Sequence, residues 1–177
     1  MTDIKVQDNF LSDDDFKELQ NKIIDANFPW YLDNIIVPPN KYKRICDPID
    51  NYQHVHHFLN YYSSPFGTTS PLCRILNPII FRMKYKSFVR IKVNLTMKTN
   101  EIVRHGFHID DSDAGEFKDY KVSIFYVNNN DGYTEFKDGT RMESVANRLI
   151  TFPAYLPHTS TTCTDEPFRV VINFNYF

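Results

Sequence analysis

The sequence predicts an α+β fold in which N-terminal helices precede a β-sandwich or barrel. Apolar residues recur at helical spacing in the first half of the chain, whereas from Phe88 onward the period changes to two and tight turns separate short runs. The chain has 177 residues, 42% of them hydrophobic, which is enough for one core. We therefore expect a single domain over residues 1–177, helical over about 10–85 and a β-barrel over about 86–177.

Three segments of the first half carry helix signals. Ser12 and the three aspartates after it form a helix start, because the hydroxyl accepts from backbone N–H groups and the acids complement the positive end of the helix dipole. Helical spacing then continues until Pro29. A second amphipathic pattern comprises Tyr52, Val55, Leu59 and Tyr62. A third helix is predicted after Ser70-Pro71, and Pro78 bends or ends it. We expect these helices to pack on one sheet.

The second half predicts strands. Over residues 88–97, apolar side chains alternate with Arg90, Lys92, Asn94 and Thr96, which indicates a strand with one polar face. Further strands are expected around 120–128, 133–137, 141–145, 148–153 and 168–177. Asp131-Gly132 and Asp138-Gly139 are turn signals between them.

Composition excludes few functions. The net charge of −2 and pI of about 6.3 give no overall attraction to nucleic acid or to anionic membranes. The three cysteines, Cys46, Cys73 and Cys163, show no metal-binding or redox spacing, and no stretch predicts a signal peptide or a membrane span. We therefore expect a reduced, cytoplasmic protein without a membrane partner.

Four residues of the second half predict a chemical function. His108 and Asp110 are two apart, so on a strand both side chains point to one side, and His158 follows a later apolar run. Two imidazoles and a carboxylate can hold one face of a ferrous ion and leave the other positions open. Arg169 begins the polar face of the last strand and is suited to bind a carboxylate co-substrate.

The H-x-D pair alone is a weak signal, because 6 histidines and 22 acidic residues would produce about 0.7 such matches by chance. The rest of the set makes the prediction specific. The last strand alternates Arg169, Val171, Asn173 and Asn175 with apolar residues, and an interior polar face requires a ligand.

These residues resemble those of the 2-oxoglutarate- and Fe(II)-dependent oxygenases, in particular the prolyl 4-hydroxylase-like branch and its small phage-type members. The resemblance covers nearly the whole chain. Its best-matched parts are residues 108–110, the run from Phe125 to Asn128 that leads into 131–136, Pro157-His158, and residues 169–177. It implies a double-stranded β-helix, a jelly-roll or cupin-like barrel, with the N-terminal helices packed on one sheet.

The resemblance also implies the roles of individual residues. His108, Asp110 and His158 would bind iron and make up the catalytic centre, and Arg169 would pair with the distal carboxylate of 2-oxoglutarate, to which Tyr126 would add a hydrogen bond. Where prolyl hydroxylases carry a tyrosine on the preceding strand, this chain has Thr96, with Asn94 on the same face. Further pocket residues implied near the metal are Asn173 and Asn175.

The implied reaction uses Fe(II), with 2-oxoglutarate and O2 as co-substrates, and ascorbate stays open as an accessory reductant. The co-substrate is decarboxylated to succinate while the substrate is oxidised. Asp110 is present where halogenases have a small residue, so hydroxylation is favoured over chlorination. The implied substrate is a peptidyl prolyl or other amino-acid side chain, with a small metabolite or a nucleobase as alternatives.

Other interpretations of the same residues stay open. The three ligands could bind zinc, although hydrolytic zinc sites usually place paired ligands on a helix and would leave Arg169 unexplained. Lys92 could replace Arg169 as the cation for the co-substrate. The chain could also be a non-catalytic β-barrel binding protein on the same scaffold, but all four key residues are present.

Three more features have simpler explanations than function. His54, His56 and His57 fall in the second predicted helix, where a partly exposed face is the first interpretation and a contact with substrate the second. The basic run over 82–92 is read as a strand edge before it is read as a nucleic-acid surface. The polar segment 111–119 follows the metal pair and is either a loop over the site or a surface connection.

Overall fold

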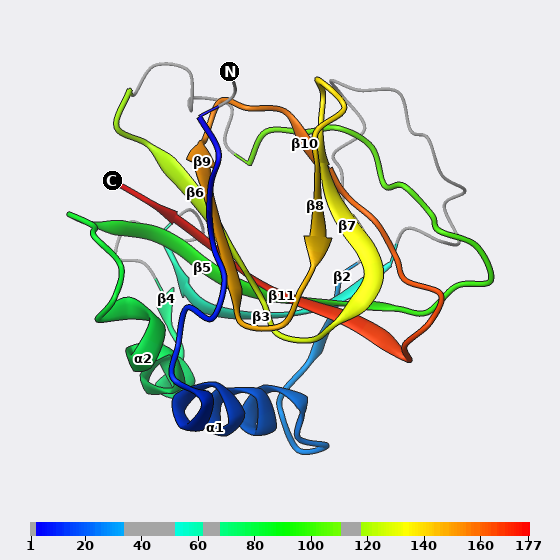
Figure 1. Cartoon of the computed structure of the whole chain (residues 1–177). Coiled ribbons are helices and arrows are strands. Elements are labelled where there is room, and N and C mark those ends of the chain that lie inside the picture. Colours follow the sequence, from blue (N-terminus) through cyan, green and yellow to red (C-terminus); the bar gives the residue numbers. More distant parts are fainter. Residues whose placement is uncertain (1–2, 34–51, 62–67, 111–117) are drawn as a thin grey trace.

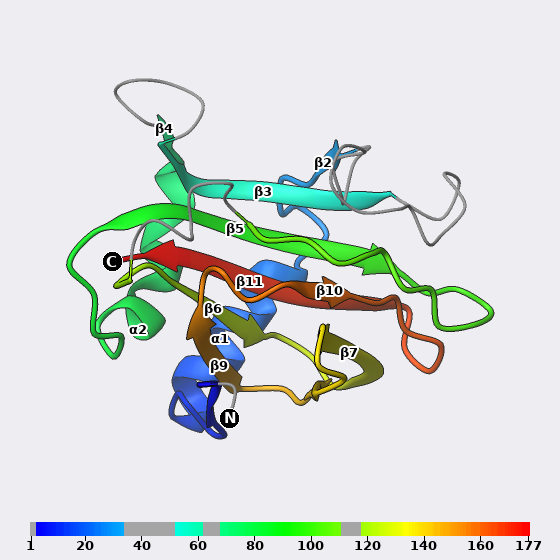
Figure 2. The same ribbon diagram turned by 90° about the horizontal axis from the view of Figure 1, so that it is seen from above.

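The computed structural model describes residues 3–33, 52–61, 68–110 and 118–177. In these ranges the chain forms two antiparallel sheets and few helices, as in a jelly-roll-like fold (Figures 1 and 2). The larger sheet has the order β1-β9-β6-β11-β5-β3-β2, with β4 paired to β3, and the smaller has the order β10-β7-β8. The strands are β1 (Lys5–Gln7), β2 (Tyr31–Asp33), β3 (Gln53–Asn60), β4 (Thr68–Thr69), β5 (Phe88–Met97), β6 (Lys121–Tyr126), β7 (Asn130–Phe136), β8 (Arg141–Ser144), β9 (Arg148–Pro153), β10 (His158–Ser160) and β11 (Phe168–Tyr176).

Two of the three predicted helices are confirmed. Helix α1 (Asp13–Ile24) begins where expected, and the Ser12 hydroxyl accepts a hydrogen bond from the Asp15 N–H at 3.3 Å. The predicted third helix is a 3-10 segment, η2 (Pro71–Leu76), that continues into α2 (Asn77–Ile80). Ser70 caps η2 by accepting from the Leu72 N–H at 3.1 Å. Pro78 lies in the first turn of α2, where its missing N–H does not matter.

The helices cover one face of the larger sheet, as predicted. In Figure 1 α1 and α2 lie on the side of this sheet that faces away from β7 and β8. Leu19 and Ile23 of α1 and Ile79 of α2 belong to one buried cluster with side chains of the central strands β5 and β11. The strand side chains in this cluster are Ile91, Val93, Val170, Ile172 and Phe174. The polar residues of β5 and β11 therefore face the opposite way, between the two sheets.

A second apolar cluster lies between the sheets. Ile124 and Ile150 of the larger sheet pack there with Phe136 of β7, and Met142 of β8 contacts the cluster. This packing holds the smaller sheet over the polar face of β5 and β11 at a fixed distance. The structure thus has one apolar interface for the helices and a partly apolar, partly polar one between the sheets.

The predicted helix at 52–62 is wrong, because Gln53–Asn60 is strand β3, which pairs with both β2 and β5. With β1, β2 and β4 also present, the described part of the first 85 residues is not mainly helical. The apolar spacing that suggested a helix arises because both faces of β3 are partly buried and a register irregularity between His57 and Leu59 breaks the alternation. Tyr62 lies outside the described residues.

The strands predicted for the second half are confirmed, with two local differences. Asp131-Gly132 lies inside β7 instead of a turn, at a register irregularity between Asn130 and Tyr133. A Cβ atom on Gly132 would come within 2.6 Å of the Thr162 carbonyl oxygen, so close packing explains this glycine. Asp138-Gly139 does form a turn, with Gly139 at φ +88°. The short strand β10 had no sequence signal of its own.

Asn147 links the N-terminal segment to the end of β8. Its φ of 63° is a left-handed conformation that asparagine tolerates better than most residues. Its buried side-chain oxygen accepts from the Leu11 N–H at 2.8 Å, and its amide donates to the Leu11 carbonyl at 2.9 Å. This pair of bonds fixes the chain directly before α1.

We expect Asn147→Ala to lower the free energy of unfolding by about 2–3 kcal/mol, because two buried backbone groups of Leu11 lose their partners. Urea denaturation measures the change. Asn129→Ala is the matched control, since Asn129 is exposed and accepts one hydrogen bond from the Ala146 N–H, so its loss should cost less than about 1 kcal/mol. Equal losses in the two variants would contradict the assignment.

Candidate metal and co-substrate site

Two histidines from distant parts of the chain lie side by side. His108 and His158 form an isolated antiparallel bridge, in which each backbone N–H donates to the other residue's carbonyl at 2.9 Å. Their ring centroids are 4.7 Å apart. His158 is held in place by β10, which pairs with β7 of the smaller sheet.

Both imidazole rings are oriented by their Nδ1 atoms. Nδ1 of His158 lies 3.1 Å from the Leu156 carbonyl oxygen, and Nδ1 of His108 lies 3.4 Å from that of Gly106. A carbonyl oxygen can only accept, so in these contacts Nδ1 carries the proton and Nε2 is left as a lone-pair donor. Both Nε2 atoms are therefore in the form that binds a metal.

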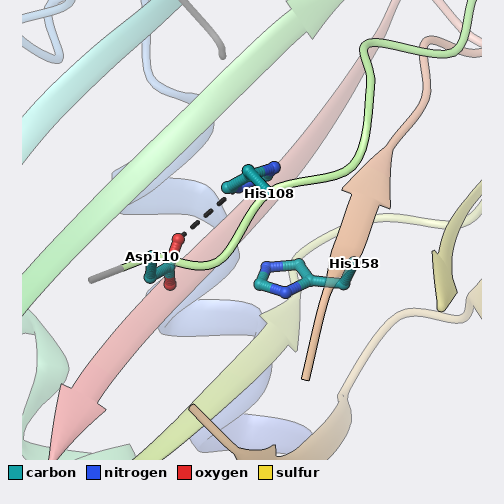
Figure 3. A group of neighbouring side chains, drawn as sticks. All are labelled: His108, Asp110 and His158. Atoms are coloured by element: carbon teal, nitrogen blue, oxygen red, sulfur yellow. Dashed lines mark ion pairs between the residues drawn. The ribbon is translucent and has the colours of Figure 1, made fainter. Parts of the chain in front are cut away.

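Asp110 completes the group. One ligand atom each from His108, Asp110 and His158 lies within 4.8 Å of the others (Figure 3). The Asp110 Oδ1 atom is 3.6 Å from the His108 Nε2 atom. Two neutral nitrogens and one carboxylate on one side of a cavity form the facial arrangement that suits Fe(II).

The Asp110 carboxylate is held by two neighbours on the larger sheet. The Arg90 Nη2 atom lies 3.2 Å from Oδ1, and the Asn175 amide donates to Oδ2 at 3.0 Å. Arg90 in turn donates to the Asn175 side-chain oxygen at 3.2 Å. The side chain of Asp110 is only 4% exposed, so these contacts fix its orientation.

The ionisation of these groups suits metal binding. Burial alone would raise the pKa of Asp110, but the Arg90 charge and the contact with His108 hold it well below its ordinary value. For His158, burial and then the nearby His108 lower the pKa to about 4. Asp110 is therefore ionised and His158 neutral at physiological pH, so neither must lose a proton before binding a cation.

Arg169 supplies a buried positive charge in the same cavity. It is 2% exposed, and its Nε donates to the Ser144 hydroxyl at 2.8 Å while Nη2 donates to the Thr134 hydroxyl at 3.2 Å. A Cβ atom on Gly132 would lie 2.7 Å from Cδ of Arg169, so the glycine leaves room for this side chain. No carboxylate among the described residues pairs with Arg169, and a buried unpaired cation favours an anionic ligand.

One cavity of about 290 Å³ joins these groups. The sequence-predicted residues that line it are His108, Asp110, His158, Arg169, Asn94, Thr96 and Asn173, together with Lys92. Three buried acceptor atoms of this lining, Oδ1 of Asn94, Oγ1 of Thr96 and Oδ1 of Asn173, have no hydrogen-bond partner in the described part of the chain. The donor set fits a divalent cation, and the unpartnered polar atoms beside Arg169 fit a polar ligand.

Tyr126 lies next to this site but does not line the cavity. It is fully buried, and its hydroxyl donates to the Thr134 hydroxyl at 2.9 Å. Thr134 lines the cavity, so the structure puts Thr134 between Tyr126 and any ligand of Arg169.

Sequence reasoning missed several contributors to the site. Thr134 and Ser144 were not singled out, because a hydroxyl in a short strand carries no distinctive pattern. Arg90 was predicted on the polar face of a strand and as part of a basic run, but its contact with a candidate metal ligand was not predicted. Gln53 also lines the cavity, and the wrong helix prediction gave no reason to expect this. His57 lines the cavity too, in line with the second interpretation of this histidine, a contact with substrate.

The neighbouring histidine His56 has a structural role instead. Its ring nitrogens lie 3.0 Å from the Pro29 carbonyl oxygen and 2.9 Å from the Ser70 hydroxyl. The segment 111–119, expected as a loop over the site or a connection, falls outside the described residues except for its last two positions.

We expect Asn175→Ala to weaken the binding of Co(II), a spectroscopic substitute for Fe(II), by about 10–100-fold, because Asp110 loses the donor that orients its Oδ2 atom. Visible absorption of the Co(II) complex measures the affinity. Asn173→Ala is the matched control from the same strand face, and it should leave Co(II) affinity unchanged because Asn173 makes no bond to a ligand side chain. A Co(II) affinity that is lost in the control and kept in Asn175→Ala would refute this assignment.

Comparison with known proteins gives the fold. No family model matches the chain, and no curated protein matches its sequence. Solved structures do match: a prolyl-4-hydroxylase from Pseudomonas putida has a TM-score of 0.60 and 15% identity, covering 99% of this chain and 92% of that one. A Trichoplax adhaerens prolyl hydroxylase, in complex with a peptide fragment of the hypoxia-inducible factor oxygen degradation domain, has a TM-score of 0.65 and 14% identity, with coverages of 100% and 84%.

The α-ketoglutarate-dependent epimerase SnoN of nogalamycin biosynthesis has a TM-score of 0.62 and 12% identity, with coverages of 99% and 78%. The chain therefore has the prolyl 4-hydroxylase-like fold of the 2-oxoglutarate- and Fe(II)-dependent oxygenases.

Proposed function

We propose that this protein is a dioxygenase that uses Fe(II), O2 and 2-oxoglutarate to hydroxylate a substrate. The observation that carries the proposal is that Arg169, buried and without a carboxylate partner among the described residues, shares one cavity with His108, Asp110 and His158. A cation site and an anion site in one cavity suit a chelating dicarboxylate. The shared fold supports the proposal but would not carry it alone.

In this proposal the three ligands hold the metal from one side. His108 and His158 present Nε2 because their Nδ1 atoms donate to backbone carbonyls, and Asp110 presents a carboxylate oxygen while Arg90 contacts Oδ1 and Asn175 donates to Oδ2. When bound, Fe(II) with 2-oxoglutarate and O2 supplies the oxidising chemistry, and succinate and carbon dioxide are released. The residues of the chain bind and orient the reactants.

Arg169 and Thr134 are proposed to bind the distal carboxylate of 2-oxoglutarate. The Thr134 oxygen already accepts from both Tyr126 and Arg169, so its own hydrogen is left to donate. A guanidinium and a hydroxyl would thus donate to the same carboxylate. Tyr126 would act through Thr134, by fixing the rotation of its hydroxyl.

Thr96, Asn94 and Asn173 are proposed to complete the co-substrate pocket. Thr96 is paired with Arg169 across β5 and β11, so its hydroxyl lies on the same face of the sheet. The unpartnered side-chain oxygens of all three residues would gain partners from the ligand or from water bound with it.

The remaining parts of the proposal concern the whole protein. We propose one domain, a closed double-stranded β-helix, acting in the cytoplasm on an amino-acid side chain of a peptide or on a small molecule, with ascorbate as an accessory reductant. The peptide in the Trichoplax complex is the precedent for the first substrate class. In the described part of the chain, no helix has the length and apolar character needed to span a membrane.

We expect the anaerobic protein to develop a weak visible charge-transfer band only when Fe(II) and 2-oxoglutarate are both added. Arg169→Lys should weaken 2-oxoglutarate binding by about 10–100-fold, because the guanidinium contacts with Thr134 and the co-substrate are lost. Arg74→Lys, on the exposed side of η2, is the control and should bind normally. Circular dichroism verifies folding in each variant.

Asp110→Ala should abolish the band and succinate formation, because one of the three ligands is removed. A fully active Asp110→Ala protein would refute the metal site. Tight binding of Zn(II) with no band after Fe(II) and 2-oxoglutarate would favour the zinc or non-catalytic alternatives.

We expect Thr134→Val, which keeps the shape of the side chain, to weaken 2-oxoglutarate binding about tenfold by removing one donor. Titration of the same charge-transfer band measures the effect. Thr140→Val is the matched control, because this threonine lies in the β7–β8 turn away from the cavity. Unchanged affinity in Thr134→Val would remove Thr134 from the proposed pocket.

A further inference from the structure

Lys92 lines the cavity and lies on β5 between Arg90 and Thr96, the residue that pairs with Arg169 across the sheet. On the polar face of β5, Arg90 contacts Asp110, and Thr96 lies beside Arg169. Lys92 lines the same cavity but makes no hydrogen bond or ion pair within the described ranges. Its ammonium group is therefore available to a ligand.

The neighbours of Lys92 suit an anion. In the register of the sheet, Lys92 is opposite His57 of β3 and Asn173 of β11, so these three side chains form one row on the cavity face. The Asn173 oxygen has no partner among the described residues, so its amide can rotate to present either a donor or an acceptor. An ammonium flanked by an amide and an imidazole can donate several hydrogen bonds to one carboxylate or phosphate.

Charge balance leads to the same conclusion. The charged side chains of the described cavity wall are Arg90, Lys92, Arg169, Asp33 and Asp110. The sum of these side-chain charges is one net positive charge when the histidines are neutral. Binding a divalent cation together with dianionic 2-oxoglutarate leaves this net charge unchanged. Arg90 is paired with Asp110, and Arg169 is assigned to the co-substrate. Burial, followed by the Arg90 charge, lowers the pKa of Lys92 to about 8, and the attraction of Asp110 and Asp33 offsets only part of this effect.

We propose that Lys92 binds an anionic group of the substrate, so that the substrate is a small acid, or a molecule that reacts close to a carboxylate or phosphate. This inference rests on the proposed function and specifies its substrate class. Lys92 lies two residues along β5 from Arg90, the contact of Asp110, which corresponds to about 7 Å, and four residues from Thr96, about 13 Å. An anion on Lys92 would therefore lie nearer the metal ligands than the distal carboxylate site.

The test observes Lys92 directly. Protein labelled with ¹³C at the lysine Cε atoms is loaded with Zn(II) and saturated with 2-oxoglutarate, and the Lys92 signal is assigned by its loss in Lys92→Arg. Acetate, inorganic phosphate and uncharged acetamide are then added separately. We expect a saturable shift of the Lys92 signal with acetate, with phosphate or with both, and none with acetamide; the exposed Lys17 of α1 is the internal control.

A variant series checks that the charge is responsible. The side-chain amide signal of Asn173 should shift when the same anion binds. In Lys92→Met the affinity for the anion, measured from this shift, should be about tenfold lower. The response should be retained in Lys92→Arg and unchanged in Lys17→Met. The amide spectrum itself verifies that each variant is folded.

Each outcome decides the inference. A shift with acetate alone indicates that Lys92 binds a carboxylate of the substrate, and a shift with phosphate alone indicates that it binds a phosphate. If the Lys92 signal shows no saturable shift with either anion, the inference is overturned. It is also overturned if the Lys92 signal shifts when 2-oxoglutarate is added and then does not shift with acetate or phosphate, because that result would assign Lys92 to the co-substrate. A normal Fe(II)–2-oxoglutarate band without an anion response would refute only this inference, whereas an anion response without the band would refute only the proposed function.

Discussion

The antiparallel pairing of β5 with β11 is the constraint on which both the core and the site depend. Along its ten residues β5 turns Ile91 and Val93 toward the helices and Lys92 and Asn94 toward the cavity, and β11 does the same in register. A slip of one residue would turn the charged side chains toward the helices and the apolar side chains toward the cavity. Burial of the apolar face therefore fixes the positions of the functional face, and no separate interaction is needed to align them.

Arg169 and Arg90 show two ways of holding a cation on that face. Arg169 is surrounded by hydroxyl groups and the Tyr126 ring, which orient it without neutralising it. Arg90 lies against Asp110 and is neutralised by it. Removing a cation from water is costly when no anion replaces the water, so the first arrangement favours an incoming anion and the second mainly orients a carboxylate. The two ends of one strand pair thus differ in the ligand they favour.

The sequence allowed the strands of the second half to be predicted, and it singled out four residues that the fold brings into one cavity, because alternation and polarity are local signals. Helix α1 was also predictable from its cap. Strand β3 was not, since its burial on both faces depends on β2 and β5, which come from other parts of the chain. For the same reason the roles of Thr134 and Arg90 could not be predicted, because they follow from contacts with Arg169 and Asp110 that only the fold creates. Local patterns find strands and ligands, whereas contacts between strands identify the groups that orient them.

The fold by itself does not choose a substrate, because prolyl hydroxylases and an epimerase of nogalamycin biosynthesis are about equally similar to this chain. The choice must come from groups that the common chemistry does not use. An internal peptidyl proline has no charge of its own near the reacting carbon, so the partly buried Lys92 would keep only the longer-range attraction of Asp33 and Asp110 and would gain no direct ion pair. A free acid would supply an anion in direct contact with Lys92. The polar face of β5 therefore favours a small charged substrate over an uncharged peptide side chain.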